Sequence, residues 1–157
     1  MNEVDLAAFS VARRAVCISL FRQLDIEDVL IRQLPANERR AVDSVVGFLN
    51  QILEENRVAQ FAFALPSDAG SERHRRILMN AIELVRRRGI PRIEIPASDL
   101  LVAYGYPPLT RREQLRNVGR SIWPALHSRA ATRLPIDAAL LGLHVQTERL
   151  IAREEAA

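Results

Sequence analysis

The sequence contains no lysine, and all 22 of its basic residues are arginine. Its single cysteine, Cys17, excludes an internal disulfide, and the apolar stretch around it is typical of a buried side chain. No apolar run approaches the roughly 18 residues of a membrane-spanning helix, and residues 1–5 lack the basic start of a signal peptide. We therefore expect a cytoplasmic protein.

Histidine and glycine are too sparse and scattered for two common kinds of site. The three histidines, His74, His127 and His144, lie far apart with no cysteine or histidine at ligand spacing, which argues against a zinc site. Gly70 and Gly89 are isolated, so no glycine-rich phosphate loop is present. At 157 residues and 48% hydrophobic composition, the chain has the size of one globular domain spanning residues 1–157.

The middle of the chain predicts a strand, a helix and a second strand. Residues 58–66 form a short apolar run, and residues 71–88 carry apolar side chains at helical spacing opposite an arginine-rich face. Gly89 ends this helix, and residues 90–96 read as a second strand. This βαβ unit predicts that the two strands lie parallel in one sheet.

The N-terminal third predicts a hairpin, a strand and a helix. We interpret residues 5–21 as two strands joined by a turn near residues 11–14, because β-branched and aromatic residues cluster at both ends. A single helix is the competing interpretation of this segment, since alanine and leucine are plentiful. Residues 26–34 predict a third strand, and Asn37 is a suitable N-cap for a helix ending near residue 56.

The C-terminal part predicts a loop followed by two helices. Residues 97–109 contain a short apolar patch and then Tyr-Gly-Tyr-Pro-Pro, which we expect to be a loop. Thr110 and Glu113 have the spacing of a capping box for a helix that stops near Pro124. After a polar connection, Pro135 suits the first turn of a last helix, from residue 136 to about 153.

This order of elements resembles the RNase H-like fold, and more closely its RuvC-type Holliday-junction resolvase branch. The motifs that carry the resemblance are Phe61-Ala62-Phe63-Ala64, Ile93-Glu94-Ile95-Pro96 after Arg-Gly-Ile-Pro, and Pro135-Ile136-Asp137-Ala138-Ala139-Leu140-Leu141. The expected fold class is therefore α/β. We expect a mixed sheet in which three antiparallel N-terminal strands precede the parallel strands, with helices flanking it.

The resemblance implies metal-assisted phosphodiester cleavage by carboxylates on the first strand, the fourth strand and the last helix. The matching positions here are Ser10, Ala64 and Asp137, so one carboxylate remains, which is too few to hold two divalent cations. We expect no cofactor. In the alternative, Asp68 and Asp137 form a displaced site that binds Mg²⁺ or Mn²⁺. The other carboxylates near strand ends are Asp5, Asp25, Glu27, Asp28 and Glu94.

Two groups of arginines begin the predicted helices, where basic side chains oppose the helix dipole unless an anion lies nearby. They are Arg73, Arg75 and Arg76 in the first group and Arg111, Arg112, Arg116 and Arg120 in the second. Tyr104 and Tyr106 precede the second group and are candidates for stacking on unpaired bases. The alternative is a solvated charged face, with Glu72 and Glu113 interleaved.

These observations lead to three hypotheses. The first is a catalytically degenerate RuvC-like domain, not an enzyme, that binds structured or branched nucleic acid, expected to be DNA, through these arginines without cleaving it. The second is an active metal-dependent structure-specific endonuclease that uses displaced acids. The third is a protein-interaction scaffold. The resemblance also implies a homodimer, and nothing in the sequence points to a membrane.

Overall fold

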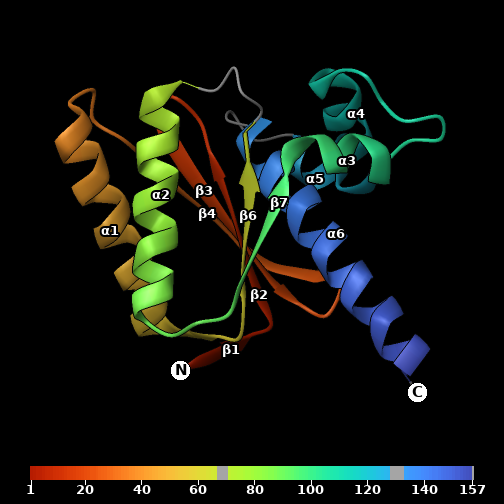
Figure 1. The fold of residues 1–157 in the computed structure, drawn as a ribbon, viewed down its shortest axis with the longest axis horizontal. Helices are drawn as coiled ribbons and strands as arrows, with labels where there is room; N and C mark the ends of the chain where they lie inside the picture. Colours follow the sequence, from red (N-terminus) through yellow and green to blue (C-terminus); the bar gives the residue numbers. More distant parts are fainter. Residues whose placement is uncertain (67–70, 128–132, 157) are drawn as a thin grey trace.

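The computed structural model describes residues 1–66, 71–127 and 133–156, which form a mixed sheet with helices on both faces (Figure 1). The five-stranded sheet has the order β4-β3-β2-β6-β7. Its strands are β2 (Leu6–Val11), β3 (Ala15–Arg22), β4 (Asp25–Gln33), β6 (Phe61–Leu65) and β7 (Arg92–Pro96). Two short strands, β1 (Asn2–Val4) and β5 (Asn56–Val58), pair parallel beside it.

The N-terminal hairpin and the parallel βαβ unit are confirmed. β2 and β3 pair antiparallel from Leu6 opposite Phe21 to Val11 opposite Val16, which excludes the helical alternative for this segment. β4 pairs antiparallel with β3 as the third strand. β6 then lies parallel to both β2 and β7, as the crossover through an intervening helix requires. The α/β fold class is therefore confirmed.

Two helices, α1 (Glu38–Glu55) and α2 (Glu72–Arg87), cover one face of the sheet (Figure 1). The side chains of Asn37 and Ser71 cap them: Asn37 accepts a hydrogen bond from the Arg40 N–H at 3.0 Å, and Ser71 accepts one from the His74 N–H at 3.1 Å. Gly89 ends the second helix in the left-handed region, with φ of +70°.

The long helix α6 (Arg133–Ala156) covers the opposite face, together with α3 (Ala97–Ala103), α4 (Arg112–Ile122) and α5 (Pro124–His127). Ser19 in β3 anchors α6, because its buried hydroxyl donates a hydrogen bond to the carbonyl of Ala138 at 2.8 Å. Helix and sheet approach closely at Gly142, where a Cβ would lie 2.2 Å from the ring of Phe21. The last helix is thereby fixed against β2 and β3.

The C-terminal prediction is incomplete in one place and wrong in two. The loop expected at residues 104–108 is present, but residues 97–103 before it form a helix that was not predicted, whose Leu100 is buried in the core on the α6 side. The capping box also lies elsewhere: the Gln114 side chain accepts hydrogen bonds from the N–H groups of Thr110 and Arg111, both at 3.0 Å. α4 consequently begins at Arg112. The last helix starts at Arg133, one turn earlier than predicted.

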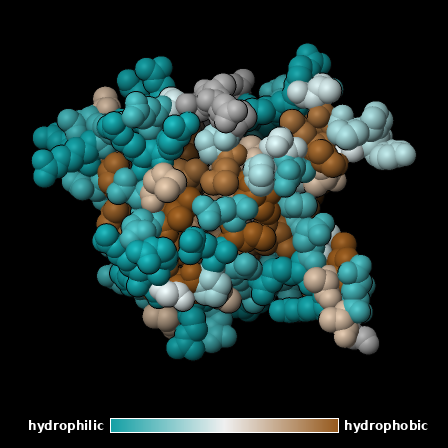
Figure 2. Space-filling view, viewed as in Figure 1, coloured by the Kyte–Doolittle hydropathy of each residue, from teal (hydrophilic) through white to brown (hydrophobic). Residues whose placement is uncertain are grey.

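The side chains of the central strands alternate between two hydrophobic cores. Ala7 and Phe9 pack toward α1 and α2, whereas Leu6 and Ala8 pack toward α6. Figure 2 shows mainly hydrophilic residues over α1 and α2, and hydrophobic residues gathered between α2 and α6, over β6 and β7. Within the described ranges, no helix is long and apolar enough to cross a membrane.

Candidate nucleic-acid interface

Two positions singled out in the sequence lie at the carboxyl end of the central strands, and the third lies in the helix that covers this face. Ala8 in β2 lies opposite Ala62 in β6, and Ser10 and Ala64 each follow two residues later. Because side chains alternate along a strand, Ser10 and Ala64 share the face that α6 covers. Asp137 lies in that helix, one residue before Ala138, whose carbonyl is bonded to the neighbouring strand. This edge therefore carries a hydroxyl, a methyl group and one carboxylate.

That carboxylate is held by an arginine. Arg116 of α4 donates two hydrogen bonds to Asp137, from Nε to Oδ1 at 3.2 Å and from Nη2 to Oδ2 at 3.0 Å. Each side chain is only 16% exposed, and the hydrogen bond to Asp137 is the main reason that the pKa of Arg116 is raised. Both carboxylate oxygens are engaged by this bidentate pair, so a cation would have to compete with the guanidinium for them.

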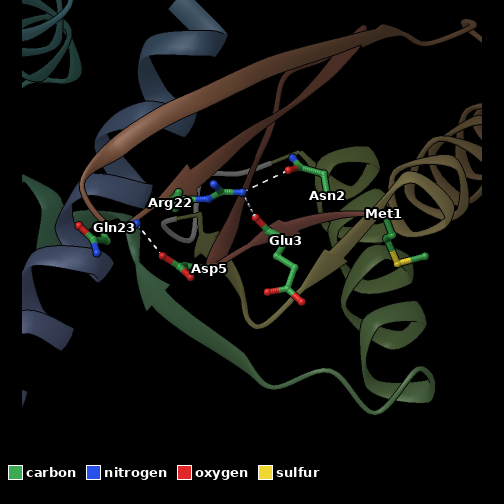
Figure 3. Close-up of a pocket in the computed structure, with 6 residues that line it drawn as sticks. All are labelled: Met1, Asn2, Glu3, Asp5, Arg22 and Gln23. Atoms are coloured by element: carbon green, nitrogen blue, oxygen red, sulfur yellow. Dashed lines mark hydrogen bonds between the residues drawn. The ribbon is translucent and has the colours of Figure 1, made fainter.

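Several of the other candidate carboxylates lie elsewhere on the sheet. Asp5 precedes β2, about 16 Å along the strand from Ser10 at 3.3 Å per residue. There its Oδ2 accepts a hydrogen bond from the Gln23 N–H at 2.6 Å (Figure 3). Asp5 and Glu3 both line an open polar pocket of about 530 Å³. Asp25 begins β4, opposite Arg22 at the same end of the sheet.

The remaining acids do not assemble a metal site either. Glu27 and Asp28 lie on the edge strand β4, and Glu27 forms an ion pair with Arg22. Glu94 on β7 is 3.7 Å from Arg92. Asp68 lies outside the described residues. Within the part of the chain that the structure describes, no three histidine, cysteine or acidic side chains could jointly hold a metal ion.

Four of the seven predicted nucleic-acid-binding arginines have partners within the fold. Arg73 donates to the backbone carbonyls of Arg13, Pro35 and Ala36 at 3.0, 2.7 and 2.9 Å, and thereby ties the β2–β3 turn and the start of α1 to α2. Arg76 pairs with Glu38 and Glu72. These side chains serve the packing of helices and loops.

The second group divides in the same way. Arg116 holds Asp137, and Arg120 contacts Glu113 at 2.9 Å and Asn117 at 2.8 Å. The other three arginines are exposed, and their guanidinium groups make no hydrogen bond or ion pair with other residues that the structure describes; they are Arg75, Arg111 and Arg112. These three side chains are available to an external anion.

The two tyrosines have different environments. Tyr104 donates a hydrogen bond from its hydroxyl to the carbonyl of Leu140, its ring lies 6.4 Å from that of His144, and burial raises its pKa. Its ring is therefore packed against α6. Tyr106, in the loop between α3 and α4, is fully exposed. Only Tyr106 presents its ring to solvent, as stacking on a base requires.

One residue of this edge was not proposed as a ligand contact from the sequence. His74, in the first turn of α2, has a buried Nε2 atom with no hydrogen-bond partner in the described parts of the chain. Its pKa is lowered, first by burial and then by the charges of Arg112, Arg73 and Arg13. These charges come from α4, α2 and the β2–β3 turn. The sequence shows His74 beside arginines, but only the fold brings Arg13 and Arg112 to it.

Comparison with known proteins identifies the fold. No family model matches the chain, and no curated protein matches it. The solved structure of Thermus thermophilus RuvC is similar, with a TM-score of 0.71, 10% sequence identity, and coverage of 92% of this chain and 95% of that one. T. thermophilus RuvC in complex with Holliday junction substrate has a TM-score of 0.65, 12% identity and coverage of 92% and 94%. The chain has a RuvC-type, RNase H-like fold.

At these identities the likeness concerns the fold alone. Within this RuvC-type fold, Ser10 and Ala64 lie on the face of the sheet that α6 covers, and Asp137 lies in α6. That these three positions form a site stays a prediction. The chemistry of that edge differs from a set of convergent carboxylates, because Arg116 pairs with its one acid, Asp137.

Proposed function

We propose that this chain is a catalytically degenerate RuvC-type domain that binds structured or branched DNA without cleaving it. The observation that carries the proposal is the bidentate pair between Arg116 and Asp137. It engages the one carboxylate among the three positions at which the resemblance implies acids. The similarity to a RuvC bound to Holliday junction substrate supports branched DNA as the ligand.

The chemistry of the edge supports binding without cleavage. Two-metal hydrolysis needs several carboxylates to neutralise and position the cations that activate water and stabilise the leaving oxygen. Ser10 offers a hydroxyl and Ala64 offers no ligand atom. Asp137 is already neutralised by a guanidinium. We accordingly propose that binding needs neither Mg²⁺ nor Mn²⁺.

Exposed basic side chains supply the attraction to DNA. Arg75, Arg111 and Arg112 are exposed near the carboxyl edge, and each phosphate that they neutralise releases condensed counterions. Tyr106 projects from the neighbouring loop, where its ring can stack on a base that is unpaired at a branch point. The proposed interface thus combines phosphate contacts with one aromatic platform.

The experiment that tests this function is a binding titration with fluorescent four-way junction, duplex and single-stranded DNA. We expect tightest binding to the junction in EDTA, with affinity that falls steeply as salt increases. Changing Arg75, Arg111 and Arg112 together to glutamine should lower both the affinity and the salt slope. The matched control changes Arg86 and Arg87, at the other end of α2, where both pair with Glu83. Equal losses in both triple and control variants would contradict the proposed interface.

A protein-binding scaffold is the second candidate. The observation that favours it is an apolar groove between β7, α3 and α6, lined by Ile93, Ile95, Val102 and Val145 with Asp99 and Glu148 beside them. β7 is the last strand of the five-stranded sheet, and an edge strand can pair with a strand of another chain. Failure to bind any of the three DNAs would favour this function.

Two further proposals accompany the first. We propose that the domain acts in the cytoplasm and that two copies bind one two-fold junction, as the RuvC resemblance implies. Sedimentation of the protein alone and with one equivalent of junction tests the second point. A complex with a single copy at saturating protein would contradict it.

A further inference from the structure

The apolar groove between β7, α3 and α6 has room for side chains of another molecule. Ile93 and Ile95 line it from β7, Val102 and Ala103 from α3, and Val145 from α6. Its volume of about 520 Å³ lies within the range of roughly 300–1,000 Å³ that is typical of ligand pockets. Figure 2 shows hydrophobic residues gathered over β6 and β7, between α2 and α6.

The α3 wall of the groove is fixed to its surroundings. The hydroxyl of Tyr104, which follows α3, donates a hydrogen bond to the carbonyl of Leu140 in α6. The Leu109 N–H donates to the carbonyl of Leu101 at 2.9 Å, and Leu100 is buried in the core. Val102, in the same helix, is nevertheless 61% exposed. A wall that is already ordered loses little conformational freedom when a partner binds.

The groove also carries negative charge. Asp99 of α3 and Glu148 of α6 line it and are exposed, and neither carboxylate forms a hydrogen bond or ion pair within the described ranges. By contrast, Glu38, Glu72 and Glu83 are paired with arginines of α2. The groove is therefore acidic on a chain whose net charge is +3.

This charge determines which partner suits the groove. The phosphates of DNA would be repelled by Asp99 and Glu148, so the groove and the proposed DNA interface fit different ligands. A basic side chain would be attracted to the same two carboxylates, and complementary charge of this kind speeds association and disfavours wrong partners.

We propose that the groove binds a segment of a partner protein that carries apolar side chains next to an arginine or a lysine. The apolar side chains pack against Ile93, Ile95 and Val145, and the basic side chain pairs with the acidic rim. This inference rests on the protein-binding function proposed above, whose partner it specifies, and it is independent of DNA binding.

The first test selects binders from a phage-displayed library of random dodecapeptides on the full chain. The library is first depleted on the variant Val102→Arg, which places a long basic side chain at an exposed position of the groove. We expect the enriched peptides to combine apolar residues with arginine or lysine. Enriched peptides without basic residues, or no enrichment at all, would overturn the inference.

The second test measures how much the acidic rim contributes. An enriched peptide is labelled with fluorescein and titrated with the full chain. Changing Asp99→Asn and Glu148→Gln together should weaken binding about tenfold, as expected for the loss of two exposed ion pairs. The matched control changes Glu154→Gln and Glu155→Gln, which are exposed near the end of α6, and should leave the affinity unchanged. Equal losses in the two double variants would contradict a specific role for the rim.

The third test locates the peptide by amide NMR signals of the chain. Val102, Ala103 and Val145 should shift as the peptide is added. Shifts confined to other surfaces would overturn the groove as the binding site. Shifts of the same three signals that follow protein concentration without peptide would show that a second copy occupies the groove, which also overturns the inference.

The outcomes separate the inference from the function on which it rests. If purely apolar peptides shift the groove signals, the basic requirement is wrong and the protein-binding function stands. If no peptide is enriched and the groove signals never move, both fail. Thermal unfolding shows whether each variant is folded, and all the substituted side chains are exposed, so we expect midpoints equal to that of the unaltered chain.

Discussion

Asp137→Asn distinguishes a structural carboxylate from a catalytic one by the sign of its effect on stability. The substitution removes the negative charge beside Arg116 while keeping the size of the side chain. Each partner is only 16% exposed, so the arginine would keep its charge in a largely desolvated position without a counter-charge. In a cluster of carboxylates the same change would relieve repulsion between like charges and would stabilise the metal-free protein.

The expected size follows from the degree of burial. Removing one partner of a fully buried pair costs about 3–5 kcal/mol, and this pair retains some contact with water, so we expect a loss of about 2 kcal/mol. For a chain of 157 residues this corresponds to a fall of roughly 4–8 °C in the unfolding midpoint. Arg116→Gln should cost a similar amount, and the double variant should cost less than the sum, because the two side chains act as one unit.

The assay is urea unfolding followed by circular dichroism and Trp123 fluorescence, with EDTA present. Glu83→Gln is the control, since it breaks exposed ion pairs on α2. An Asp137→Asn variant as stable as the parent, or more stable, with no coupling to Arg116, would refute the ion-pair account. Stabilisation of the parent chain by Mn²⁺ that this variant loses would point to a metal ligand instead.

Two further predictions concern the fold away from the interface. Gly142→Ala should destabilise the protein by about 1–3 kcal/mol in urea unfolding, because the new Cβ would lie 2.2 Å from the Phe21 ring. Gly47→Ala is the control: this position in α1 has open space around it, so the substitution should stabilise the protein. A Gly142→Ala variant as stable as the parent would contradict the packing of α6. In an NMR titration the Glu83 carboxyl should show a pKa of about 2, held low chiefly by its hydrogen bond to Arg86. The ionised carboxylate therefore stabilises the helix at neutral pH, and this stabilisation is lost as pH falls toward 2. Arg86→Gln should raise that pKa, and an unchanged value would contradict the pairing.

The sheet could be predicted because each strand carries a local signal. Apolar and β-branched residues mark β2, β3 and β6, and Gly89 marks the end of α2 with the left-handed conformation that it adopts. The helix α3 could not be predicted in this way. Its seven residues follow a proline and show no clear period, and its stability comes from burying Leu100 against a distant helix.

The arginines show why the site was harder to predict than the fold. Arg73 and Arg75 are two positions apart, yet one bonds three backbone carbonyls and the other is exposed. Arg116 meets Asp137 across 21 residues of sequence. Composition and helical position identify both groups as basic helix starts, but only tertiary packing decides which guanidinium groups have partners. The convergence of Arg13 on His74 likewise depends on the β2–β3 turn lying against α2.

The most direct test of the central claim is a single-turnover cleavage assay with excess protein, a labelled four-way junction and Mn²⁺. The same samples in EDTA show how much junction is bound. We predict that the junction is fully bound in EDTA and that every strand remains intact after Mn²⁺ is added. Strand nicks that require Mn²⁺ and disappear in Asp137→Asn would contradict the account, since Asp137 would then hold a metal ion during the reaction.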